Sequence, residues 1–168
     1  MWFKYPLIIL LFFVLAIFQA SFLPHFSIFG IAPDLVFIAF FTLIFFEKPR
    51  HYYEGIFFTI TAGSILDLFS TSRFGAAIGT LFLLYFITKT MVYFLKESRH
   101  QFPIFYFFPI FLISFILYVM IQRGLTGFYD VRFFLNQQML IALAYNTIIA
   151  LFVFYLYPAK SPKQLKLL

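Results

Sequence analysis

The chain has 168 residues, of which 64% are hydrophobic and 11% are charged, and its formal net charge is +6. A soluble domain is usually about half apolar and about a quarter charged, so this chain has too little polar surface to cover a water-facing globule. The composition excludes an ordinary soluble domain and predicts a single-domain integral membrane protein. Because the sequence has no cysteine, disulfides and cysteine metal sites are excluded as well.

Six apolar runs have the length, or nearly the length, of roughly 17–25 residues that crossing a bilayer requires. We expect helices, because the runs are continuous rather than alternating as in a transmembrane barrel. In chain order, the expected spans are 5–23, 31–46, 53–70, 74–95, 102–122 and 137–157. The predicted fold is therefore an all-α membrane protein with six transmembrane helices in one domain, residues 1–168.

The first two expected spans differ in how they begin and end. The first, 5–23, ends before Pro24, and we expect it to be retained because no small-residue cleavage motif follows it. The second, 31–46, is short and carries Pro33 and Asp34 near its start. Proline followed by an acid is a common helix opening, because the carboxylate faces the positive end of the helix dipole.

The third expected span, 53–70, carries Asp67 in an otherwise apolar run. At about 1.5 Å per residue, this carboxylate lies roughly 20 Å along the helix, in the outer third of a hydrocarbon core about 30 Å thick. Facing lipid there would be costly, so Asp67 should face protein or a water-filled recess. Two explanations remain open. One is an ion pair with Arg73 or Arg123 that holds helices together, and the other is an outward-facing polar recess shared with Asp34.

Small residues spaced four apart begin the fourth expected span, where Gly75 and Gly79 frame two alanines. The first span has the same spacing at Ala16 and Ala20. Such spacing lets membrane helices approach closely, so we expect these four residues to mark helix packing. Polar residues inside the first and sixth spans should form hydrogen bonds between helices, namely Gln19 and Asn146.

Positive charge is distributed unequally over the two sides that six spans create. One side carries nine basic residues: Lys4, Lys48, Arg50, Lys89, Lys96, Arg99, Lys160, Lys163 and Lys166. The other side carries three: Arg73, Arg123 and Arg132. Because cytoplasmic loops of membrane proteins are enriched in lysine and arginine, we expect both termini in the cytoplasm. The net positive charge then records orientation, and nucleic acid is not an expected partner.

No pattern in the sequence predicts an enzyme, a metal site or a bound cofactor. The three histidines fall in expected loops, at positions 25, 51 and 100, without the grouped carboxylates or shared helix face of a metal site. Serines near His25 have no flanking pattern that would mark a nucleophile paired with a base.

Two patches carry a family resemblance: "GIAPDLVFI" at residues 30–38 and "GSILDLFSTSRFG" at residues 63–75. Together with the order of the spans and the near absence of soluble loops, they resemble the MreD family of rod shape-determining proteins. The resemblance implies a non-enzymatic subunit of the cell-elongation and peptidoglycan-synthesis machinery (the elongasome) in the bacterial inner membrane. The implied partners are MreC and, in the same machinery, MreB, RodA and a penicillin-binding transpeptidase, besides membrane lipids.

The same resemblance implies an alternative function from another class. The MreD family is thought to share its fold with the substrate-binding S-components of energy-coupling-factor vitamin transporters. An S-component binds its vitamin in an outer-facing pocket and docks through small residues of its first helix, for which Ala16 and Ala20 would serve. Against this alternative, the outer side carries few recognition groups outside residues 123–136.

Overall fold

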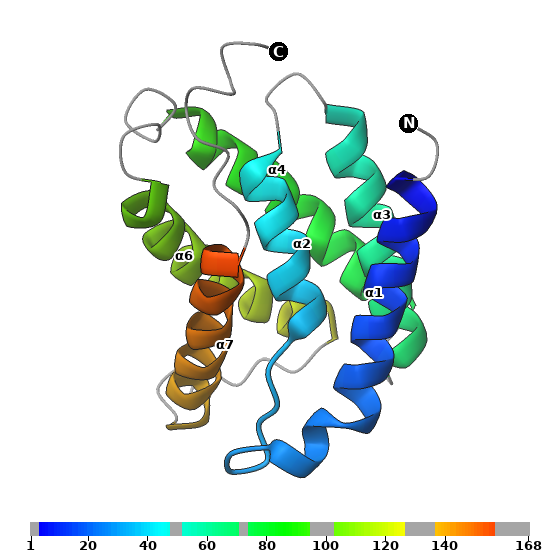
Figure 1. Ribbon diagram of the computed structural model, residues 1–168, viewed down its shortest axis with the longest axis vertical. Helices are drawn as coiled ribbons and strands as arrows, with labels where there is room; N and C mark the ends of the chain where they lie inside the picture. Colours follow the sequence, from blue (N-terminus) through cyan, green and yellow to red (C-terminus); the bar gives the residue numbers. More distant parts are fainter. Residues whose placement is uncertain (1–3, 48–51, 71–73, 95–102, 127–136, 157–168) are drawn as a thin grey trace.

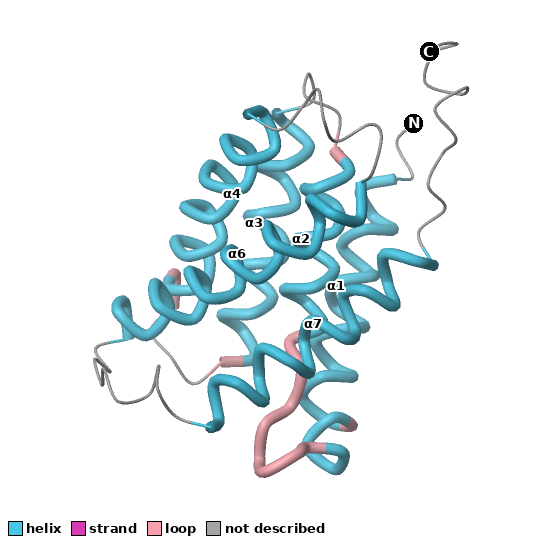
Figure 2. The backbone as a smooth tube through the Cα atoms, turned by 90° about the vertical axis from the view of Figure 1, so that its left-hand side faces the viewer, coloured by secondary structure: helices cyan, strands magenta, loops and turns pink. Residues whose placement is uncertain are grey.

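The computed structural model describes residues 4–47, 52–70, 74–94, 103–126 and 137–156. Within these ranges the chain forms six α-helices and one short 3-10 helix, packed as a single bundle (Figures 1 and 2). In chain order they are α1 (Lys4–Ser21), η1 (Leu23–Phe26), α2 (Leu35–Phe46), α3 (Tyr52–Phe69), α4 (Ala76–Phe94), α6 (Pro103–Thr126) and α7 (Gln137–Leu156).

The helices have the length and composition of a membrane protein, which confirms the predicted all-α membrane class. Four described helices are long and apolar enough to cross a bilayer, namely α1, α4, α6 and α7. Helix α2 is apolar but has only 12 residues. Helix α3 is 18 residues long and less apolar, since it carries Glu54 in its first turn and Asp67 near its end.

Two helix boundaries differ from the sequence prediction by about one turn. The second helix begins at Leu35 rather than at residue 31, because residues 28–31 form a tight hairpin and Asp34 caps the helix. The fifth predicted span continues as α6 to Thr126 rather than ending at residue 122. Residues 31–34 are the approach to α2 rather than its first turn, and α6 continues past the polar residues Gln122 and Arg123 at which the prediction ended the span.

Helix α2 lies in the middle of the bundle and forms its aromatic core with α6 (Figure 1). Three of its five phenylalanines are spaced four residues apart, at positions 37, 41 and 45, and these three are almost fully buried. They pack against a matching series on α6 at positions 107, 111 and 115. Other helices cover most of α2 and leave only Leu35, Ala39, Leu43 and Phe46 half-buried, which accounts for its almost entirely apolar sequence.

Two glycines of α3 allow this helix to pack closely on its neighbours. A Cβ atom at Gly63 would lie 2.6 Å from the Cα atom of Ile78, so the backbones of α3 and α4 touch there. A Cβ atom at Gly55 would lie 2.2 Å from the ring of Tyr85 in α4 and 2.8 Å from a carboxylate oxygen of Glu47. Close approach at glycine is the usual basis of helix packing in membranes.

Candidate functional site

The side chain of Asp34 caps the start of α2. Its Oδ1 atom accepts a hydrogen bond from the backbone N–H of Phe37 at 2.9 Å. This bond satisfies an amide that has no partner within the helix, and the carboxylate faces the positive end of the helix dipole. The prediction that Asp34 opens the second helix in this way is confirmed.

Three other helices send polar side chains to the same helix start. Tyr118 of α6 donates its hydroxyl to Oδ2 of Asp34 at 2.8 Å. The backbone N–H of Asp34 donates to Oδ1 of Asn146 in α7 at 2.7 Å, and the N–H of Val36 donates to Oε1 of Gln19 in α1 at 3.3 Å. The expectation that Gln19 and Asn146 form hydrogen bonds between helices is confirmed, and the start of α2 is tied to α1, α6 and α7.

The side chain of Asp67 holds the start of α4 in a similar way, from the end of α3. Its Oδ2 atom accepts hydrogen bonds from the backbone N–H groups of Gly75 at 2.9 Å and Ile78 at 3.3 Å, and its Oδ1 atom accepts one from Ala77 at 2.9 Å. Only 5% of Asp67 is exposed. The carboxylate therefore faces protein, as expected. The three amides that it accepts lie at the start of α4, where a helix offers them no backbone acceptor.

The two carboxylates hold two different helix starts, Asp34 that of α2 and Asp67 that of α4. Arg73, one expected ion-pair partner of Asp67, lies outside the described residues. Arg123 is in the last turn of α6. An ion pair of Asp67 with either arginine, in addition to its three hydrogen bonds from backbone amides, therefore stays a prediction.

The four small residues expected to mark helix packing have different surroundings. Ala16 is buried in the core, whereas Ala20 is exposed. Gly75 has a φ of +95° and open space around it, so it serves the turn that starts α4 rather than a close contact. A Cβ atom at Gly79 would meet Leu125 at an ordinary 3.8 Å, so the tight contact on α4 is made opposite Gly63 instead.

Charged side chains pair at the other end of the bundle. Lys89 of α4 forms an ion pair with Glu47, which follows the last residue of α2, and only 1% of the Glu47 side chain and 12% of the Lys89 side chain are exposed. Lys4 of α1 pairs with Glu54 of α3 at 2.5 Å, with 50% and 22% of these side chains exposed. The burial of this pair was not predicted from the sequence, in which Lys89 counts among the basic residues of the expected cytoplasmic side.

Two hollows of moderate size are lined by residues that the structure describes. One, of about 300 Å³, is lined by Phe29, Gln137, Gln138 and Ile141. The other, of about 330 Å³, is lined by apolar residues of α6 and α7, among them Phe105 and Leu151. Asp34 and Asp67 line neither of these two. Across the described parts of the chain, no three histidine, aspartate or glutamate side chains are grouped so that they could hold a metal ion.

Comparison with known proteins found no family model, no curated protein and no solved structure that matches this chain. The family resemblance of the two sequence patches therefore stays a prediction.

Proposed function

We propose that this protein is a non-enzymatic scaffold subunit of the bacterial cell-elongation machinery, which binds a single-span membrane partner of the MreC kind. The observation that carries the proposal is that the side chains of the two aspartates inside the bundle are bonded to other parts of the protein. Both accept backbone amides at a helix start, and both join helices, Asp34 through the hydroxyl of Tyr118 in α6 and Asp67 through the amides at the start of α4. In a transporter or a membrane enzyme, an intramembrane carboxylate would be expected to face a substrate or ion pathway. The two sequence patches that resemble the MreD family support the same conclusion.

Helix α1 is the surface that fits a partner helix best. It is the least buried of the four long apolar helices, and between its ends the exposed side chains are apolar. Ala20 is exposed near its end, next to Ser21, which is also exposed. Small residues let a second helix approach closely, and in lipid such packing supplies the affinity between helices. Asp34 and Asp67 point into the bundle, so we do not expect them to contact the partner directly. Their role is to hold the starts of α2 and α4 in place, and so to keep the shape of the bundle that the partner binds.

We also infer an inner-membrane location with both termini in the cytoplasm, from the nine-to-three division of basic residues. The ion pairs of Lys4 with Glu54 and of Lys89 with Glu47 support the grouping of these four charges at one end. A reporter fused at Lys160 and another inserted in the 123–136 loop should report opposite sides of the membrane. Reports from the same side would mean that a span has been miscounted.

The partner is tested by co-purification from membranes. The wild-type chain should retain the single-span MreC-type protein in mild detergent, and Ala20→Leu should lower the retained amount severalfold because the added side chain separates the two helices. Ala144→Leu is the matched control, because Ala144 is an exposed alanine on α7. It should retain the partner as the wild type does. Depletion of the protein should turn rod-shaped cells round, with MreB filaments mislocalised.

Two results would contradict the proposal. Equal retention by Ala20→Leu and Ala144→Leu would remove α1 as the partner surface. Tight binding of a vitamin by the purified chain, without any association with an MreC-type protein, would favour the transporter S-component instead.

A further inference from the structure

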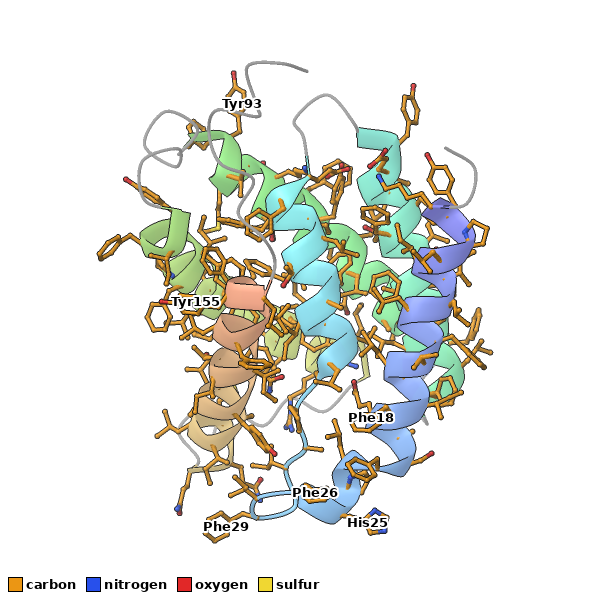
Figure 3. The ribbon with its side chains drawn as sticks, viewed as in Figure 1. Phe18, His25, Phe26, Phe29, Tyr93 and Tyr155 are labelled. Atoms are coloured by element: carbon orange, nitrogen blue, oxygen red, sulfur yellow. The ribbon has the colours of Figure 1, made fainter. Side chains whose placement is uncertain are left out.

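The connection between α1 and α2 forms an aromatic tip at one end of the bundle, beyond the start of α7 (Figures 1 and 3). It comprises residues 22–31, which include the helix η1 and the hairpin that follows it. Phe18, Phe22 and Phe26 stack in series, with ring centroids 4.6 and 4.9 Å apart. All three are exposed, and Phe29 at the end of the tip is 75% exposed.

The backbone of Phe29 lies in a conformation that suits a different residue type. Its φ is +54° and that of Gly30 is +77°, in a two-residue turn closed by hydrogen bonds in both directions between Ile28 and Ile31. Turns with two positive φ angles favour asparagine, aspartate or glycine at the first of these positions. A polar residue would suit both the conformation of the turn and exposure to water. A phenyl ring at this exposed position therefore indicates that the tip contacts an apolar or interfacial environment as well as water.

The tip satisfies much of its own backbone, as a segment that contacts lipid must. Five backbone amides between residues 22 and 31 donate to carbonyl groups of the same connection or of α1. In addition, Ser27 donates its hydroxyl to the carbonyl of Pro24, and Tyr145 of α7 donates to the carbonyl of Phe26. The sequence from residue 21 to residue 33 contains no lysine, arginine, aspartate or glutamate.

The length of α1 gives the depth of the tip. Its 18 residues span about 27 Å at about 1.5 Å per residue, close to the thickness of a hydrocarbon core of about 30 Å. With Lys4 at one boundary, Phe22 and the residues after it lie at the opposite boundary. Gln137 and Gln138, both exposed at the start of α7, line a hollow with Phe29 and place polar amides at the same level.

We propose that residues 22–31 form an interfacial anchor, in which the rings of Phe22, Phe26 and Phe29 insert between lipid headgroups at the end of the membrane-spanning surface of α1. The apolar surface of the tip continues the exposed apolar surface of α1. Because the tip carries none of the four charged residue types, it recognises the headgroup boundary of any phospholipid rather than an anionic headgroup. This inference is independent of the proposed partner.

The test is depth-dependent quenching of a single tryptophan in vesicles. Trp2 is the one tryptophan of the chain, so Trp2→Phe with Phe29→Trp places the only indole on the tip. In phosphatidylcholine vesicles, lipids brominated close to the headgroup should remove more than half of its emission, and aqueous iodide should remove little. Adding anionic lipid should leave the quenching profile unchanged.

A control and a second probe make the outcome decisive. Phe82→Trp in the same background places the indole on the exposed face of α4, where bromines deep in the acyl chain should quench best. Phe26→Trp replaces Phe29→Trp if the turn does not tolerate the larger ring. Strong quenching by iodide with none by brominated lipid would overturn the anchor, and so would maximal quenching by the deepest bromines or a requirement for anionic lipid.

Discussion

We expect the variant Lys89→Met to lose about 3 kcal/mol or more of its free energy of unfolding. Methionine keeps the apolar stem of lysine and removes the charge, so the Glu47 carboxylate stays buried without its ion-pair partner. Removing one member of a buried pair is strongly destabilising because the remaining charge is uncompensated. Unfolding in mixed detergent micelles of increasing denaturing strength, followed by circular dichroism, measures the loss.

Two further variants separate this effect from the loss of a charge in general. The double variant Glu47→Gln with Lys89→Met should recover at least half of the lost stability, because no buried charge remains. Lys4→Met removes the exposed pair with Glu54 and should cost less than about 1 kcal/mol. Equal losses for Lys89→Met and Lys4→Met would show that the burial of the Glu47–Lys89 pair has no energetic consequence.

The helices of this protein could be predicted from the sequence because its apolar runs are long and clearly separated. The predicted spans and the observed helices agree closely at most ends, and they disagree at the start of α2 and at the end of α6. Residues 31–34 are the main example, since Pro33 and Asp34 belong to the approach to α2 rather than to the helix. The hairpin before them depends on positive φ angles at Phe29 and Gly30, and phenylalanine does not signal such a turn.

The partners of the buried polar groups were harder to predict, because they are set by tertiary packing. Asp34 was identified as a cap from its own neighbours in sequence, since its amide partner is three residues away. Its bond to Tyr118, 84 residues further along, left no local signal. The burial of Lys89 was missed for the same reason, because a lysine near the end of a membrane helix is usually an exposed basic residue.

The contact at Gly63 shows why spacing alone is a weak guide to packing. Gly75 and Gly79 have the expected spacing, yet the backbones meet where Gly63 of α3 faces Ile78 of α4. A single glycine opposite a helix backbone is enough for close approach, and it produces no repeating pattern. One signal was present in the sequence: Gly63 lies four residues before Asp67, so both are placed on the same face of α3.

Asp67→Leu should be among the most destabilising substitutions in the chain, with an expected loss of about 3–5 kcal/mol. Leucine has a similar size and accepts no hydrogen bond, so the amides of Gly75, Ala77 and Ile78 lose their acceptor in a buried place. Each unsatisfied buried donor costs about 1–3 kcal/mol, and part of this is recovered if the first turn of α4 opens. Asp67→Asn keeps one carboxamide oxygen and should lose about half as much.

The comparison of the two variants decides what holds the end of α3 to the start of α4. If amide capping dominates, the asparagine variant lies clearly between wild type and Asp67→Leu in micelle unfolding, and Leu68→Ala, at the 70% exposed neighbouring position, stays close to wild type. If instead Asp67→Asn is as unstable as Asp67→Leu, the negative charge itself is required. An ion pair with Arg73 or Arg123 would then be the main interaction, because the one carboxamide oxygen of asparagine still accepts part of the amide hydrogen bonds but carries no charge to pair with a guanidinium.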